Sequence, residues 1–130
     1  MKVNRFIFNI STTRLAETRD FYTELFNFSA GYDSNWFVSM QAEGQPFELG
    51  IIRNNHNIVP EPVREQPVNG VFLTLVVPDV DALHQEVFNK GIPVLEEPTD
   101  TFYGQRRMLI QDPAGTVVDV STPLPDVTFE

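Results

Sequence analysis

Apolar residues alternate or recur at helical spacing in an order that repeats once along the chain. Residues 3–10, VNRFIFNI, are rich in β-forming residues and predict a strand. Residues 13–26 carry apolar side chains at helical spacing and predict an amphipathic helix. Three short strands are expected next, at about 28–33, 36–41 and 46–53. The first half of the chain therefore predicts the order β-α-β-β-β.

The same order of elements is predicted again in the second half. The apolar run VFLTLVV at 71–77 predicts a buried strand. Asp79 can cap a helix that follows this strand, and Gly91 is a good stop for the same helix. Three more strands are expected at about 92–97, 104–111 and 116–121. The chain is therefore predicted to hold an internal repeat in element order.

A polar segment with three prolines separates the two halves. We interpret this segment, residues 54–69, as a linker between module one, 1–53, and module two, 70–122, with a tail over 123–130. The whole chain, 1–130, is then a single α+β domain. Two βαβββ modules can pack with their curved mixed sheets around a shared cavity and their helices outside.

Charge and composition exclude several classes of partner. The chain has 18 acidic and 9 basic residues, a formal net charge of −9, which argues against nucleic acids and anionic membrane surfaces. The same charge suits a cationic ligand or simple solubility. There is no cysteine, which excludes disulfides and thiolate metal sites. No apolar run approaches the roughly 20 residues that span a membrane, and no export signal is recognisable, so we expect a cytoplasmic protein.

Three phrases of the sequence carry a resemblance to a known family. They are DFYTELFNF, VPDVDALHQEVFNKGIPV and DPAGTVVDV, in that order along the chain. Over about residues 3–122 the chain resembles the vicinal oxygen chelate superfamily. That superfamily includes glyoxalase I, extradiol dioxygenases, fosfomycin-resistance enzymes and bleomycin-resistance proteins. The resemblance implies the two-module fold, but it does not fix an activity, because one fold hosts many functions.

The resemblance also implies four positions for metal ligands, two in each module. They fall on Arg5 and Glu48 in the first module and on Phe72 (Val71 if the alignment slips by one) and Asp119 in the second. Histidine is common in the family where Arg5 and Phe72 stand here. Arginine stays protonated and phenylalanine has no lone pair, whereas a transition metal needs at least three protein donors. We therefore expect no divalent metal and no other cofactor.

Strand alternation predicts which side chains line the cavity. Ile7 and Asn9 share the face of Arg5, whereas Phe6, Phe8 and Ile10 are expected to pack beneath the first helix. One residue of each of the pairs Trp36–Phe37 and Arg106–Arg107 is expected to face the cavity, and Tyr103 lies near its mouth. The predicted ligand-binding residues are Arg5, Ile7, Asn9, Trp36, Glu48, Phe72, Thr74, Tyr103, Arg107 and Asp119.

Two interpretations of Arg5 stay open. Its guanidinium can sit between Glu48 and Asp119, in the place of the missing cation, or it can simply reach solvent. The two histidines favour no site, because His56 is expected in a solvated loop and His84 on the surface of the second helix. No catalytic residue is assigned.

The expected function is metal-free binding or sequestration of a small molecule. The bleomycin-resistance branch implies a homodimer that encloses a bulky, often cationic drug and thereby confers antibiotic resistance. One alternative is a lyase, isomerase or dioxygenase of the same superfamily with an altered site, in which Glu48 or Asp119 acts as general base. Another is a protein-interaction module with a vestigial cavity. The sequence leaves open whether the modules pair within one chain or across a dimer.

Overall fold

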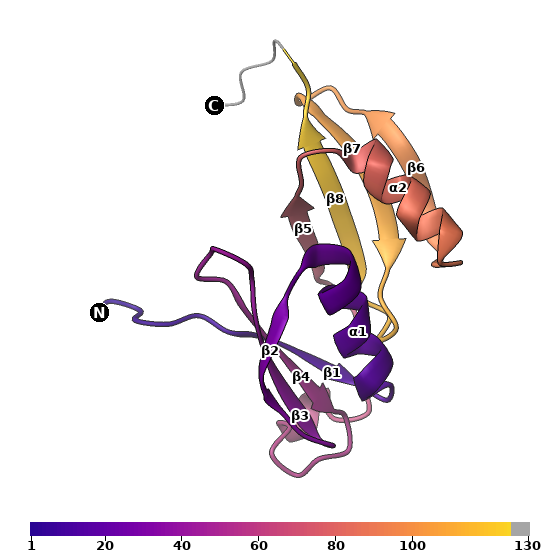
Figure 1. The fold of residues 1–130 in the computed structure, drawn as a ribbon. Coiled ribbons are helices and arrows are strands. Elements are labelled where there is room, and N and C mark those ends of the chain that lie inside the picture. The colour runs from indigo at the N-terminus through magenta and orange to yellow at the C-terminus, as the bar shows by residue number, and fades with distance from the viewer. Residues whose placement is uncertain (126–130) are drawn as a thin grey trace. The chain divides into compact units, whose positions relative to one another are not determined.

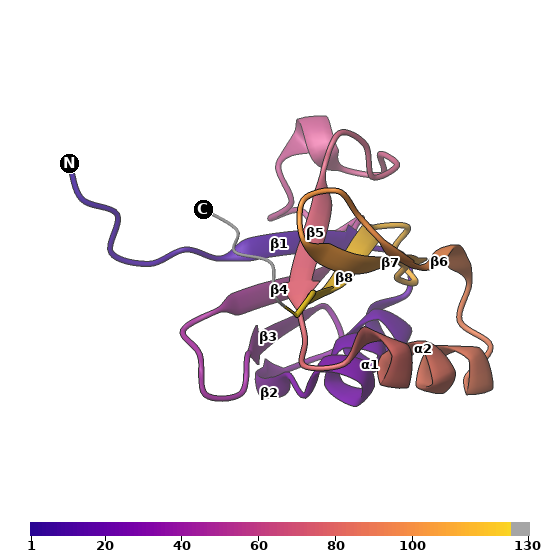
Figure 2. The same cartoon turned by 90° about the horizontal axis from the view of Figure 1, so that it is seen from above.

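The computed structural model describes residues 1–125, and the chain divides into two compact units between Pro67 and Val68. Each unit holds one four-stranded sheet and one α-helix (Figure 1). In both ribbon views each helix lies along one side of its own sheet (Figure 2). The α+β class and the twofold β-α-β-β-β order predicted from the sequence are confirmed. The closing of both sheets around one shared cavity stays a prediction.

The first unit is a mixed sheet covered by α1. Its elements are β1 (Phe8–Thr12), α1 (Leu15–Phe26), β2 (Ser29–Asp33), β3 (Phe37–Gln41), β4 (Glu48–Arg53) and the short 3-10 helix η1 (Glu61–Val63). The strand order is β1-β4-β3-β2, with β1 parallel to β4 and the other pairs antiparallel. Tyr22 of α1 is fully buried, as are Val38 and Ile51 on the two central strands. The alternation predicted for these strands thus selects the face that packs beneath α1.

The first strand begins later than the sequence predicts. Strand β1 starts at Phe8 rather than at residue 3, and the residues before it run away from the sheet in both views (Figures 1 and 2). Phe6 is 74% exposed, so its predicted place beneath the helix is wrong, whereas Ile10 is buried as expected. The reason is the length of the neighbouring strand. Phe8 pairs with Leu49, and β4 begins only one residue earlier, so the residues before Ile7 extend past the start of β4.

The segment expected to be a polar linker is folded onto the first unit up to Pro67. Asn54 N donates to Thr12 O at 3.0 Å, which continues the line of β1 and β4. Arg64 Nη2 donates to the carbonyl oxygens of Asn57 and Val59, and Val59 is only 3% exposed. We call residues 54–67 the connector. The connector folds as part of the first unit because its few apolar residues can pack against that unit.

The second unit repeats the plan of the first. Its elements are β5 (Phe72–Val76), α2 (Val80–Asn89), β6 (Val94–Asp100), β7 (Gln105–Gln111) and β8 (Val117–Pro123), in the sheet order β5-β8-β7-β6. Strands β5 and β8 are parallel, and β8 runs antiparallel to β7. Val87 of α2 packs over a fully buried layer from the central strands, which includes Met108 and Val118.

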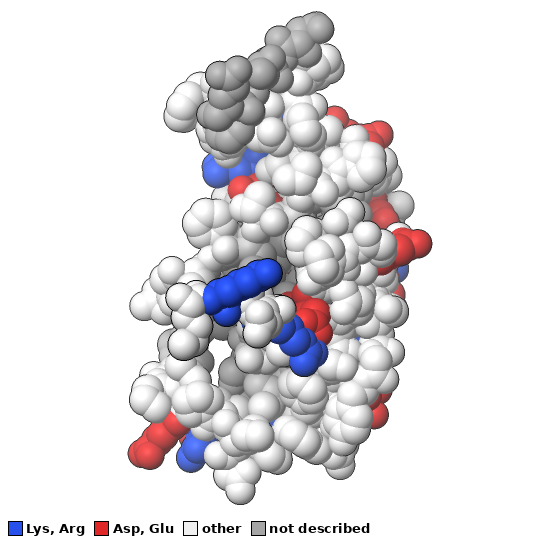
Figure 3. Space-filling model, turned by 90° about the vertical axis from the view of Figure 1, so that its left-hand side faces the viewer, with Lys and Arg blue, Asp and Glu red and all other residues white. Residues whose placement is uncertain are grey.

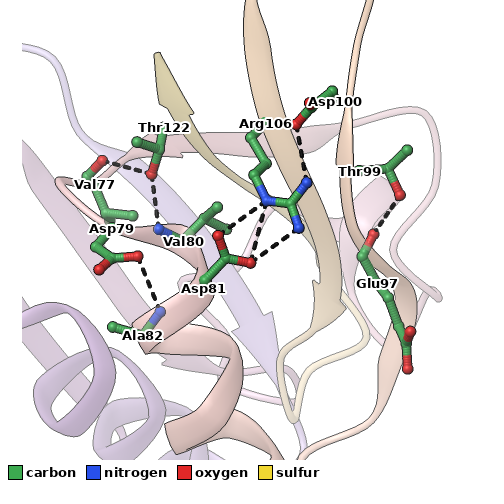
Figure 4. A network of polar contacts seen from close by, with 10 residues as sticks. All are labelled: Val77, Asp79, Val80, Asp81, Ala82, Glu97, Thr99, Asp100, Arg106 and Thr122. Atoms are coloured by element: carbon green, nitrogen blue, oxygen red, sulfur yellow. Dashed lines mark hydrogen bonds and ion pairs between the residues drawn. The ribbon is translucent and has the colours of Figure 1, made fainter. Parts of the chain in front are cut away.

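Polar side chains fasten the start of α2 to its sheet (Figure 4). Asp79 Oδ1 accepts from Ala82 N at 3.1 Å, which confirms the predicted cap. Arg106 bridges Asp81 of α2 and Asp100 of β6, at 3.0 and 2.9 Å. Hydrogen bonds with Asp81 and then Asp100 raise the pKa of Arg106. Since Arg106 points toward α2, its neighbour Arg107 belongs to the opposite face of the sheet.

Candidate functional site

The face of the first sheet that α1 leaves uncovered carries mixed polar and apolar side chains. Asn9 pairs in register with Gly50, which in turn pairs with Ser39. One step along the strands, Ser11 pairs with Ile52 and Ile52 with Phe37. These residues alternate with the buried row beneath α1, so they form the open face of the sheet.

A hollow of about 420 Å³ lies between this open face and the connector. Its lining is formed by Asn9, Ser11, Trp36, Phe37, Ile52, Ile58, Val59, Pro60 and Val63. Two aromatic residues form one part of the wall, aliphatic residues of the connector form another, and no charged side chain among residues 1–125 takes part. Mixed walls of this kind, apolar with a few polar groups, are typical of small-molecule sites.

Trp36 is held in the hollow by a ring stack that the sequence did not reveal. Its indole lies on the imidazole of His56, with ring centroids 4.1 Å apart and planes at 15°. His56 Nδ1 accepts a hydrogen bond from Ile58 N at 3.2 Å. His56 is therefore half-buried against an aromatic partner rather than in a merely solvated loop. The stack links strand β3, next to which Trp36 lies, to the connector.

Gly50 leaves space for neighbouring side chains on the open face of the first sheet. A Cβ atom at this position would overlap Asn9 Oδ1 and would lie 3.1 Å from Phe37 Cε2. Asn9 and Phe37 both line the hollow. The missing side chain of Gly50 thus lets the Asn9 amide and the Phe37 ring lie across the middle of the sheet.

Arg5 forms a salt bridge with Glu48 at the start of β4. Arg5 Nε donates to Glu48 Oε2 at 2.7 Å, and Nη2 donates to Oε1 at 2.5 Å. These hydrogen bonds, with the charge of the guanidinium, hold the pKa of Glu48 below its ordinary value of 4.5 and raise that of Arg5. The side chain of Arg5 is nevertheless largely exposed. Both interpretations of Arg5 are thus partly right, and its further approach to Asp119 stays a prediction.

In the second unit Asp119 is a buried carboxylate held by hydroxyl groups. Ser121 Oγ donates to Asp119 Oδ1 at 2.6 Å, and Thr74 Oγ1 donates to Oδ2 at 3.2 Å. Phe72, on the same face of β5 as Thr74, is 63% exposed. The predicted residues Phe72, Thr74 and Asp119 thus share the face of this sheet that α2 leaves open.

Arg107 also belongs to this face, as the alternation with Arg106 requires. Its Nη2 donates to Glu96 Oε2 at 3.2 Å, and its Nη1 approaches the Tyr103 hydroxyl at 3.5 Å. A hollow of about 470 Å³ opens beside it, lined by Gly70, Val71, Phe72, Arg107, Leu109 and Val117.

The structure brings the predicted residues together in two sets, one in each unit. Asn9 and Trp36 line the first hollow, and Phe72 and Arg107 line the second. Ile7 is exposed and belongs to neither lining. Sequence reasoning missed the connector residues of the first hollow. The available signal was their apolar character within a polar segment, which for Val59 reflects burial.

Residues 3–120 match the family described as the Glyoxalase/Bleomycin resistance protein/Dioxygenase superfamily. The chain belongs to this superfamily. None of the curated proteins compared with the sequence matches it.

Several solved structures share the fold of this superfamily member at low sequence identity. The antibiotic-binding protein TnmS3 from Streptomyces sp. CB03234 is 21% identical over 94% of this chain and 97% of its own, with a TM-score of 0.74. A superfamily member from Sphaerobacter thermophilus is 20% identical over 94% and 98%, with a TM-score of 0.75. Virulence protein STM3117 from Salmonella typhimurium is 18% identical over 95% and 100%, with a TM-score of 0.74. At these identities the likeness shows the fold alone.

The side chains present do not fit the divalent metal that many superfamily enzymes hold. Two of the four ligand positions carry Arg5 and Phe72, which cannot donate to a cation. A third, Glu48, already has both carboxylate oxygens bound by Arg5. Among residues 1–125, no group of three or more His, Cys, Asp or Glu side chains is placed to hold a metal ion.

On the face drawn in Figure 3 most of the surface is uncharged, and several Lys and Arg side chains lie near Asp or Glu side chains. None of the helices in the described part of the chain is long and apolar enough to cross a membrane.

Proposed function

We propose that this superfamily member binds a small, neutral, largely apolar aromatic molecule in the hollow of its first unit, without a metal ion and without converting the ligand. The observation that carries the proposal is the hollow between the open sheet face and the connector, with Trp36 in its wall. Two polar residues, Asn9 and Ser11, can orient a ligand that the apolar walls desolvate.

The ligand class follows from what lines the hollow. Among residues 1–125, no Asp or Glu takes part in the lining, so the negative charge of the chain places no carboxylate in this hollow. Trp36 and Phe37 offer aromatic surface, their ring centroids 5.6 Å apart. An aromatic compound gains from contact with such rings beyond its buried area. Antibiotic binding by TnmS3, which shares the fold, is in keeping with this proposal.

The absence of conversion rests on the same lining. Among residues 1–125, the lining includes no Asp, Glu, Lys or His side chain, the groups that usually act as general acid or base. Glu48, the first-unit candidate for a general base, is bound by Arg5. Sequestration by binding alone is the simpler consequence.

A fluorescence titration tests the proposal. Trp36 is the only tryptophan of the sequence, so its emission reports on this hollow. The neutral probe N-phenyl-1-naphthylamine should quench Trp36 by energy transfer and brighten as it enters the hollow, and chromatography should recover it unchanged. No saturable binding, or conversion of the probe, contradicts the proposal.

Two variants place the binding in the first unit. Ile58→Asp puts a charge into the lining at an exposed connector position and should weaken probe binding at least about tenfold, because a desolvated carboxylate is costly beside an apolar ligand. Val3→Asp makes the same change at an exposed N-terminal position outside the lining and should leave binding unchanged. Equal losses of probe affinity in both variants would show that binding depends on net charge rather than on the hollow.

We also propose that the protein works as a homodimer. The apolar side chains of Phe6, Phe72 and Val76 are more than 60% exposed, and a second copy of the chain would remove this apolar surface from water. Light scattering coupled to size-exclusion chromatography should give twice the mass of the 14.8 kDa chain. A monomer at micromolar concentration would contradict the dimer and leave the binding proposal to its own test.

A further inference from the structure

The sequence contains one asparagine that is followed directly by a glycine, Asn69–Gly70. Every other asparagine precedes a residue with a side chain, as Asn57 precedes Ile58. The backbone nitrogen of a following residue can attack the side-chain amide carbon of an asparagine, and a Cβ atom on that following residue hinders the attack. Because glycine has no Cβ atom, Asn69–Gly70 offers the lowest steric barrier to this reaction in the chain.

The structure leaves both residues open to solvent. They lie between η1 and β5, outside the helices and strands of the described chain, just after the boundary between the two units. Asn69 and Gly70 are both exposed. Apart from the chain neighbours of Gly70, no heavy atom lies within 4 Å of a Cβ atom placed on it, and its φ angle is +78°, which glycine adopts at little cost. There is thus room for a ring to form between the two residues.

The fold does not use the two groups that would react. Within residues 1–125, the Asn69 side chain and the Gly70 N–H make no hydrogen bond to other protein atoms. Strand β5 begins only at Phe72, which pairs with Val117, so the ladder of the second sheet does not hold the Gly70 nitrogen. A reaction between these groups therefore breaks no hydrogen bond within the described protein.

We propose that Asn69 is a site of spontaneous modification in the folded protein, where water converts the side-chain amide to a carboxylate without an enzyme. The deprotonated nitrogen of Gly70 attacks Cγ of Asn69, and the new C–N bond closes a succinimide ring. The Cγ–Nδ2 bond breaks, and the amide leaves as ammonia with the proton taken from the Gly70 nitrogen. Water then opens the ring at either carbonyl, which gives aspartate or isoaspartate. This inference does not rest on the proposed function.

Incubation of the full chain in buffers from neutral to mildly alkaline pH tests the proposal. Peptic digestion at acidic pH, where the ring closes slowly, followed by mass spectrometry locates each deamidated asparagine. Deamidation should accumulate at Asn69 and should accelerate as the pH rises, because the deprotonated nitrogen is the nucleophile. Asn57 is the internal control. It is also exposed in an irregular segment but precedes Ile58, so it should react at least about tenfold more slowly.

Three variants assign the reaction to this dipeptide, with isoaspartate counted by methyl transfer from labelled S-adenosylmethionine with protein isoaspartate methyltransferase. Asn69→Gln can close only a larger ring and should remove most of the isoaspartate. Asn57→Gln makes the same change at the control position and should leave the isoaspartate count unchanged. Gly70→Ala adds the hindering Cβ atom and should slow the reaction about tenfold or more. If its positive φ prevents Gly70→Ala from folding, which thermal melting reveals, Asn69→Gln still carries the test.

Three results would overturn the proposal. The first is deamidation at Asn69 no faster than at Asn57, and the second is an isoaspartate count that is unchanged in Asn69→Gln. The third comes from comparison with a short peptide of residues 67–72, which should react at a rate close to that of the full chain. A far slower reaction in the full chain would mean that the fold protects Asn69.

Discussion

At the scale of single residues, Arg5 pairs with Glu48 without becoming a buried ion. The guanidinium holds Glu48 through two short hydrogen bonds while its own side chain stays largely in solvent. An exposed pair of this kind contributes little stability, but it lowers the pKa of Glu48.

The pair predicts a specific pH dependence. Because the folded pKa of Glu48 lies below its ordinary value of 4.5, the contribution of the pair is present above about that pH and is lost as the pH falls through the lower folded value. In Arg5→Gln the pKa of Glu48 should rise toward 4.5, which a carboxyl NMR titration measures. Arg14→Gln removes another exposed arginine and should leave Glu48 unchanged. Identical titration of Glu48 in the unsubstituted chain and in Arg5→Gln would contradict the role of Arg5.

Gly50 carries a second prediction at the scale of a residue. Gly50→Ala adds a methyl group that overlaps Asn9 Oδ1 and crowds Phe37, so both side chains must shift within the first hollow. Affinity for N-phenyl-1-naphthylamine should fall several-fold. Gly44→Ala is the matched change at a glycine outside the lining, and it should leave affinity unchanged even if its positive φ of 68° costs stability. Unaltered affinity in Gly50→Ala would show that the open face tolerates the methyl group.

At the scale of elements, the order of helices and strands was predictable but their ends were not. Apolar periodicity located α1 and α2 to within two residues, and for α2 the capping residue Asp79 lies next to the periodic pattern. The start of β1 was placed five residues too early, because β-forming residues continue past the point where β4 offers a partner. Strand ends depend on a neighbour that is distant in sequence.

Thr122 tests how β8 fastens α2 to the sheet. Its Oγ1 accepts from Val80 N at 2.8 Å and donates to Val77 O at 3.0 Å (Figure 4). Thr122→Val keeps the shape and removes both hydrogen bonds, so the free energy of unfolding should fall by about 1–3 kcal/mol in urea titrations. Thr122→Ser keeps the hydroxyl and should lose less. If Thr122→Ser lowers the free energy of unfolding as much as Thr122→Val does, the methyl group of Thr122 rather than its hydroxyl is responsible.

At the scale of the whole molecule, the two carboxylates at ligand positions implied by the resemblance, Glu48 and Asp119, lie one in each unit. Glu48 is bound by Arg5, and Asp119 by Ser121 and Thr74, so both carboxylates have partners within their own units. In each unit, protein side chains thus donate hydrogen bonds to the carboxylate in place of a metal ion.

Metal addition therefore should not stabilise the chain. A site that binds only the folded state adds about 2.7 kcal/mol at 100 times its dissociation constant, which would raise Tm by several degrees. Ni²⁺, Zn²⁺, Mn²⁺ and Fe²⁺ should each leave Tm unchanged, and elemental analysis of protein purified without chelators should find no stoichiometric metal. One bound ion per chain, with a matching rise in Tm, would overturn the metal-free proposal.

The sequence by itself determined the repeat of elements and the buried face of each sheet. These depend on local periodicity and on residue type, which a single chain displays directly. Only the tertiary structure decided that Trp36 stacks on His56 and that the connector forms a wall of the first hollow. These contacts join residues distant in sequence, and their geometry depends on how strands, turns and connector pack, which no local pattern records.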